Sequence, residues 1–189
     1  MMERVTESSP RFMARIAGVF YLLNVVTALF AFSGSGTHWM AVASGHIATA
    51  CYIAVTVLFY SLFKPVNRSL SLAAAFFGLV ACAIGSLNPL HLVPFHIHSL
   101  VFFGIYCLLI GCLILRSAFL PRILGALMAI AGLGWLTFLS PQFAHSVSPY
   151  NYAAGGIGEI SLTLWLLVMG VNAARWKEQA GAAVASTRA

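Results

Sequence analysis

The side chains best suited to bind a ligand are one glutamate and a set of histidines. Glu159 is the one acidic residue within a long apolar stretch, where an ionisable group is costly and therefore marks a candidate functional site. The histidines are His38, His46, His91, His96, His98 and His145. None belongs to an HExxH or CxxCH motif, so any site they form is defined by the fold and not by local spacing.

Three of these residues form a candidate metal site. Two imidazoles and one carboxylate, here His46, His98 and Glu159, are a ligand set that suits zinc, or ferrous iron with open coordination positions. Such a centre could activate water for hydrolysis or for lipid chemistry. Haem held axially by His46 and His98 is a weaker alternative. With Asn24 and Thr163, the same residues could instead line a pocket for a small molecule or a lipid.

The composition indicates which elements must position these residues. Hydrophobic residues make up 61% of the 189 residues and charged residues only 7%, whereas soluble domains carry roughly 25% charged residues. A bilayer is therefore the expected solvent. A spanning helix needs about 20 mostly apolar residues, and strands of a membrane barrel would alternate in polarity. The sequence predicts an all-α polytopic bundle of six transmembrane helices, over 13–32, 41–63, 70–88, 96–115, 121–139 and 154–173.

The basic residues predict how this bundle is oriented. With six spans, all of them fall on one side of the membrane, at Arg4, Arg11, Arg15, Lys64, Arg68, Arg116, Arg122, Arg175, Lys177 and Arg188. The positive-inside rule makes that side cytoplasmic. We expect both termini to be cytoplasmic in the inner membrane of a bacterium, with tails over 1–12 and 176–189 around a transmembrane domain over 13–175. Basic residues dispersed in this way argue against nucleic-acid binding.

The same topology gathers the histidines at the outer end of the bundle. At 1.5 Å per residue, His46 and Glu159 lie about 7 Å inside their predicted helices and His98 about 3 Å inside. We therefore expect these three residues to share a layer in the outer leaflet. Asn24 is expected to form an interhelical hydrogen bond, and Thr163 lies one turn beyond Glu159 on the same face.

A proline-containing turn carries the other candidate binding residues. Arg116 and Arg122 flank this turn at the predicted cytoplasmic interface. Two arginines in that position could bind the headgroup of an anionic lipid, and plain anchoring of the helices is the alternative. Membrane lipids are accordingly the partners that the sequence predicts.

Four stretches resemble a bacterial integral-membrane family, domain of unknown function 4386. The stretches are Ala14–Leu23, Lys64–Leu70, Phe103–Trp135 in part, including Leu115–Gly125 and Ala131–Trp135, and Ile157–Gly170 in part, including the pair Gly158-Glu159. The resemblance implies a small polytopic inner-membrane protein and draws attention to Glu159 and to the turn from Arg116 to Arg122. It implies no activity.

Three kinds of function remain open at this point. The protein could bind a small molecule or lipid in an outer-leaflet pocket, with Glu159 as a polar anchor. It could be a metalloenzyme or haem protein that uses His46, His98 and Glu159. It could also be a structural or assembly protein in which polar residues only join helices. Bound metal, a co-purifying ligand, or a loss of stability without loss of activity would distinguish them.

Overall fold

The protein is a bundle of α-helices in the computed structural model, which describes residues 9–33, 37–87 and 98–188. No strand occurs within these ranges. The helices are α1 (Pro10–Phe32), α2 (His38–Phe63), α3 (Arg68–Leu87), α4 (Ser99–Arg116), α5 (Arg122–Leu136), α6 (Pro141–Ser146), α7 (Tyr150–Val168) and α8 (Ala173–Arg188), with a 3₁₀ turn at Thr137–Leu139. The all-helical fold class predicted from the sequence is confirmed.

Within the described ranges five helices are able to cross a bilayer, or six if α7 and α8 are taken together. The helices α1 to α4 each meet the requirements of length and apolarity alone, and so does α5 with its 3₁₀ extension to Leu139. The helix α7 meets them only with α8, across a 103° bend. Its lower apolarity follows from Asn151, Glu159, Thr163 and several glycines. At 1.5 Å per residue its 19 residues still extend for about 28 Å, close to the hydrocarbon thickness.

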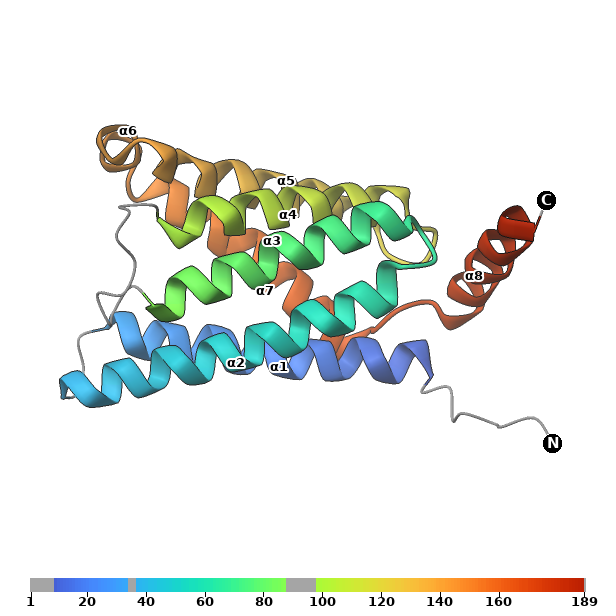
Figure 1. Cartoon of the computed structure of the whole chain (residues 1–189), viewed down its shortest axis with the longest axis horizontal. Coiled ribbons are helices and arrows are strands. Elements are labelled where there is room, and N and C mark those ends of the chain that lie inside the picture. Colours follow the sequence, from blue (N-terminus) through green and yellow to red (C-terminus); the bar gives the residue numbers. More distant parts are fainter. Residues whose placement is uncertain (1–8, 34–36, 88–97, 189) are drawn as a thin grey trace.

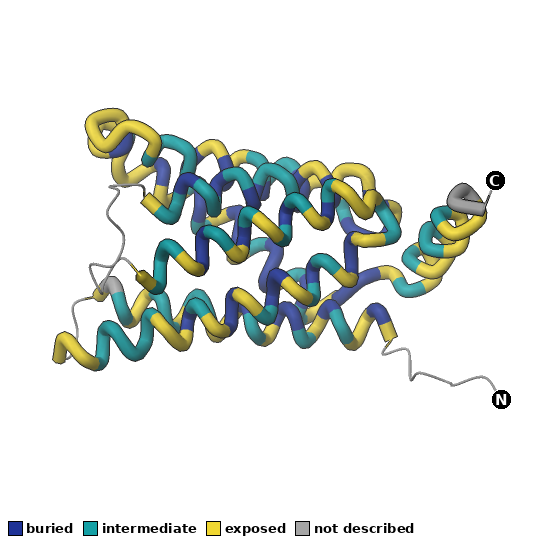
Figure 2. Tube along the Cα trace, in the orientation of Figure 1, coloured by how far each residue is buried: buried dark blue, intermediate teal, exposed yellow. Residues whose placement is uncertain are grey.

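The long helices form a closed ring, with each helix next to its neighbours in the chain (Figure 1). Contacts run from α1 through α2, α3, α4 and α5 to α7, which packs back against α1. The buried residues in Figure 2 face the inside of this ring, and many of the outward-facing residues are large and apolar. An apolar exterior is what a lipid-facing surface requires.

Glycines allow α4 and α5 to approach each other closely. A Cβ added at Gly132 would lie 2.7 Å from the carbonyl oxygen of Gly104, and one at Gly111 would lie 2.8 Å from that of Gly125. Without a hydrophobic drive between helices in lipid, such close backbone approach supplies the packing contacts. The glycines of α4 and α5 therefore face each other.

The C-terminal segment is helical as far as Arg188, although the sequence predicted a loose stretch over 178–189 within the C-terminal tail. Two side chains tie the first turns of α8 to the bundle. The indole of Trp176 donates to the Leu62 carbonyl at 2.8 Å, and Gln179 bonds both the Arg116 carbonyl and the Ala118 amide. At the other end of the bundle the stretch expected to be a loop contains the short helix α6, which begins where Ser140 accepts a bond from Phe143 N–H.

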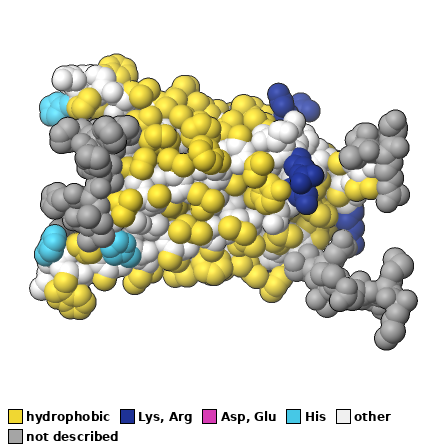
Figure 3. Space-filling model, viewed as in Figure 1, with side chains coloured by type: hydrophobic (Ala, Val, Ile, Leu, Met, Phe, Trp, Pro, Cys, Tyr) yellow, Lys and Arg dark blue, Asp and Glu magenta, His cyan; other side chains and the backbone are white. Residues whose placement is uncertain are grey.

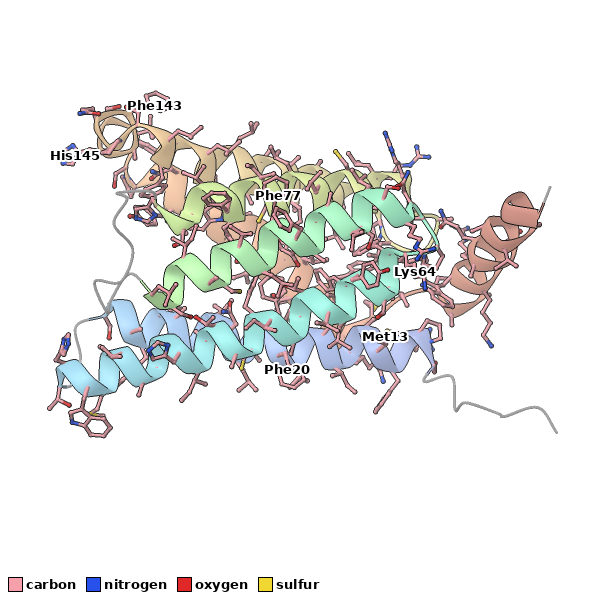
Figure 4. The ribbon with its side chains drawn as sticks, in the orientation of Figure 1. Met13, Phe20, Lys64, Phe77, Phe143 and His145 are labelled. Atoms are coloured by element: carbon pink, nitrogen blue, oxygen red, sulfur yellow. The ribbon has the colours of Figure 1, made fainter. Side chains whose placement is uncertain are left out.

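Lys and Arg side chains lie at one end of the bundle and histidines at the other (Figure 3). In the view shown, Lys and Arg side chains are at the end where the chain begins and finishes, and histidines are at the other end. Figure 4 shows the same separation in Lys64 and His145. This segregation is the pattern on which the predicted orientation rests.

Candidate functional site

Glu159 lies inside the ring, held by hydrogen bonds from two other helices. Its side chain is 8% exposed. Trp135 on α5 donates from Nε1 to Oε1 at 2.8 Å, and the Tyr21 hydroxyl on α1 donates to Oε2 at 3.3 Å. A Cβ at Gly155 would overlap the Trp135 ring, so this glycine lets the indole lie against α7 beside Glu159. Three helices therefore meet at one carboxylate.

A group of buried tyrosines extends from this carboxylate across the ring. The rings of Tyr21 and Tyr52 meet edge to face with centroids 5.6 Å apart, and those of Tyr52 and Tyr106 at 5.5 Å. Within the described residues, the hydroxyls of Tyr52 and Tyr106 are buried without a hydrogen-bond partner. Tyr21 is thus the one member of this trio whose hydroxyl is tied to Glu159.

An open pocket of about 350 Å³ lies at the histidine-bearing end. It is lined by His98, Phe138, Leu139, Pro141, Ala144, His145, Ser148 and Tyr152. The His98 ring packs on Phe138 with centroids 4.8 Å apart, and Phe138 meets Tyr152 edge to face at 5.4 Å. Tyr152 in turn meets Trp135 at 5.9 Å. The aromatic wall of the pocket therefore continues directly to the indole that binds Glu159.

The position of His98 differs from the one predicted. It caps the N-terminus of α4, where its Nδ1 accepts a bond from Leu100 N–H at 3.4 Å. Partial burial lowers the pKa of His98 below its usual value of 6.5. A neutral imidazole with an accepting Nδ1 suits both the cap and an aromatic pocket.

The helix α6 is fixed over the pocket by Asn151. This amide donates to the Thr137 hydroxyl at 3.1 Å and to the Ala144 carbonyl at 3.2 Å. It thereby connects the end of α5, α6 and the start of α7. This single buried side chain thus ties together the segments that carry His145 and Tyr152.

The residues predicted for the site are only partly brought together. Asn24 donates to the Ala48 carbonyl of α2 at 2.9 Å, which confirms the predicted interhelical bond. Thr163 is buried and bonds the Glu159 carbonyl at 2.8 Å. His46 is exposed on α2, and no bond in the described structure joins it to Glu159. Since α7 begins at Tyr150, Glu159 lies about 14 Å along it, deeper than the sequence predicted.

The proposed ligand set for zinc, iron or haem is not assembled. Over residues 9–33, 37–87 and 98–188, no three His, Cys, Asp or Glu side chains lie close enough to hold a metal ion. His98 shares its pocket with His145 and not with His46 or Glu159. His91 and His96 lie outside the described residues. Arg116 and Arg122 are exposed at the ends of α4 and α5.

The sequence alone did not point to Trp135, Tyr21, His145 and Tyr152 as members of these clusters. A signal was present for the first two, because a tyrosine or tryptophan in an apolar span usually needs a partner for its O–H or N–H group. Both also lie in stretches that carried the family resemblance. The other two depend on the fold of the α6 region.

Comparison with known proteins identifies the family. Residues 33–98 and 89–170 match the family model described as a domain of unknown function, DUF4386. The chain belongs to the DUF4386 family. One relative is a protein of Archaeoglobus fulgidus described as uncharacterized, which is 32% identical over 127 residues, or 62% of this chain and 76% of the relative. No solved structure matches the chain significantly.

Proposed function

We propose that this DUF4386 protein is an integral protein of the cytoplasmic membrane that binds a small, flat, ring-containing amphiphile at its outer end. Both termini lie in the cytoplasm in this proposal, as the segregation of Lys and Arg supports. The pocket between His98, His145 and Tyr152 is the binding site, and Glu159 is the polar anchor behind it.

The observation that carries this proposal is the aromatic wall that joins the pocket to Glu159. Ligand pockets are mostly apolar and aromatic, with a few polar groups that orient the ligand. Here Phe138 and Tyr152 supply the rings, and the two imidazoles supply hydrogen-bonding groups. Because Tyr152 contacts Trp135, a ligand against Tyr152 would bear on the indole that holds the buried carboxylate.

The ligand class follows from the lining. Ring faces favour a flat partner, and an uncharged wall favours one that is soluble in lipid. Among the described residues that line this pocket none is acidic or strongly basic, so this lining holds no fixed charge with which to recognise an ion. A quinone-like ring, with carbonyl acceptors for the imidazole N–H groups, has the required chemistry.

Trp135 provides the test, because quinones quench nearby indole fluorescence. We would replace Trp39 and Trp165 by Phe and keep Trp176, whose indole bonds Leu62 at the opposite end of the bundle. Titration with a water-soluble short-chain benzoquinone should quench part of the emission in a saturable manner. Tyr152→Ala should abolish the saturable part, and Phe143→Ala, an exposed aromatic of α6 that does not line the pocket, should leave it unchanged.

Two results would count against the proposal. Quenching that rises linearly without saturation would indicate collision and not binding. Equal loss in Tyr152→Ala and Phe143→Ala would indicate a general effect on this end of the protein.

If Glu159→Gln lowers stability but leaves saturable quenching intact, Glu159 has a structural role and only the anchor part of the proposal fails.

A further inference from the structure

A second cavity lies at the opposite, basic end of the bundle. Its volume is about 390 Å³, and its lining includes Arg11, Phe119, Trp165, Gly170, Asn172 and Arg175. Four segments meet there, namely the start of α1, the turn between α4 and α5, the end of α7 and the start of α8. Figure 1 shows α8 leaving the bundle at this end.

The turn between α7 and α8 forms this cavity. Gly170 has φ 67°, a left-handed conformation that glycine adopts without strain. The chain then returns to the α4–α5 turn, where Asn172 N–H bonds the Phe119 carbonyl at 3.2 Å and Arg175 Nη1 bonds the Ala118 carbonyl at 3.4 Å. A Cβ at Gly170 would lie 3.1 Å from Cγ of Arg11, so the stem of Arg11 packs over this glycine.

The cavity carries positive charge without a counter-charge in its lining. Arg11 and Arg175 both line it, and none of the lining residues in the described part of the chain is acidic. Arg175 uses one N–H group on Ala118, which leaves its other donors available. Within the described part of the chain, Arg11 has no hydrogen bond or ion pair, although its neighbour Arg15 donates to the Val168 carbonyl at 3.5 Å. Two arginine forks with free donors are suited to a phosphate group.

The cavity also has an apolar side that would suit a lipid. Trp165 and Met169 form part of its wall, and Met169 is 55% exposed. The adjacent Val168 is exposed on the outside of the bundle, where acyl chains would lie. A headgroup phosphate could thus occupy the basic part while its chains follow the outer face of α7.

We propose that this cavity binds a phosphate group, carried by the headgroup of an anionic lipid. Arg11 and Arg175 supply the donors, with Trp165 and Met169 beside them. The arginines that the sequence singled out, Arg116 and Arg122, are exposed and do not line the cavity. The site is independent of the aromatic pocket at the other end.

The test measures the affinity of detergent-purified full-length protein for short-chain phosphatidylglycerol by microscale thermophoresis. Arg11→Gln should weaken binding about tenfold, because it removes a charged donor fork. Arg11→Lys should restore most of the loss, and Arg122→Gln should have no effect. Since Arg11 has no bonding partner in the described structure, we expect Arg11→Gln to fold normally, as a thermal melt will check.

Two further probes separate the source of the phosphate from the existence of the site. Inorganic phosphate should bind much more weakly than phosphatidylglycerol, and equal affinity would keep the anion site but assign it to a soluble phosphate. Short-chain phosphatidylcholine should bind weakly. Equal affinity for the two lipids, or equal weakening by Arg11→Gln and Arg122→Gln, would overturn the proposal.

Discussion

The indole Nε1 of Trp135 donates to the Glu159 carboxylate across 2.8 Å, and this bond joins α5 to α7 inside the bundle. Removing the indole leaves one carboxylate oxygen without its donor in a buried site. Trp135→Phe should therefore lower the free energy of unfolding by about 1–3 kcal/mol. Trp165→Phe is the control, because no hydrogen bond of the Trp165 indole occurs among the described residues. Unfolding in sodium dodecyl sulfate, followed by circular dichroism, measures both, and equal effects would contradict the assignment.

The three buried tyrosines should respond differently to loss of their hydroxyls. Tyr21→Phe removes the bond to Oε2 of Glu159 and should cost about 0.5–1.5 kcal/mol. Tyr52→Phe and Tyr106→Phe remove hydroxyls that have no partner in the described structure, so each should be neutral or stabilising. The same unfolding assay applies. A larger loss for Tyr52→Phe than for Tyr21→Phe would show that the Tyr52 hydroxyl has a partner such as a buried water.

Two glycines of α7 provide a matched test of helix packing. A Cβ at Gly158 would lie 2.6 Å from the Leu127 carbonyl oxygen of α5, whereas one at Gly156 meets nothing within 4 Å. Gly158→Ala should cost about 1–3 kcal/mol through overpacking. Gly156→Ala should be neutral or slightly stabilising, since alanine favours helix more than glycine does. If both variants unfold alike, α5 and α7 do not approach as closely as described.

The cap formed by His98 should make stability depend on pH. Because burial lowers its pKa below 6.5, the unfolded state takes up the proton first as the pH falls. Its stabilising contribution is present above pH 6.5 and is lost as the pH falls through the lower folded-state pKa. His98→Asn keeps a capping acceptor and cannot titrate, so its thermal stability should fall less between pH 7.5 and 5. His145 and Tyr152 share the pocket, so His145→Gln serves as the comparison.

Metal analysis distinguishes the pair that shares a pocket, His98 and His145, from the pair predicted as ligands, His46 and His98. The structure puts His98 in one pocket with His145 and leaves His46 exposed on α2. We expect His46→Ala to leave the metal content of purified protein unchanged, as measured by inductively coupled plasma mass spectrometry. Metal that is present in the wild type and lost in His98→Ala and His145→Ala would place it in this pocket. Metal lost in His46→Ala would restore the ligand set predicted from the sequence.

The fold was predictable because lipid allows few alternatives. Backbone groups without water must bond within the segment, so long apolar runs such as that around α4 are helical. The positions of turns followed from proline and from charge. The helix α8 was missed because its docking depends on Trp176 and Gln179 reaching carbonyl and amide groups of α2 and of the α4–α5 turn. Such long-range contacts leave no periodic pattern.

The candidate site was predictable only in part. An acidic group in an apolar span must find a polar partner, which singled out Glu159 correctly as a buried, bonded residue. The hydrogen-bond partner of Glu159 could not be chosen from its depth along the helix alone, because several polar side chains lie within one helical turn of that depth. The direction in which each side chain leaves its helix decides between them. His46 is exposed on the outside of α2, whereas Tyr21 and Trp135 point into the ring and bond Glu159.

The bend at Gly170 has a consequence for the order in which the molecule is assembled. Because α8 follows every membrane-length helix in the chain, it is synthesised after them and can dock only when α2 and the α4–α5 turn are already in place. The bonds of Trp176 and Gln179 thus form after the other helices have been made. A chain released at residue 171 would still contain the helices of the ring and the Glu159 cluster, but the contacts that α8 makes at the basic end would be missing.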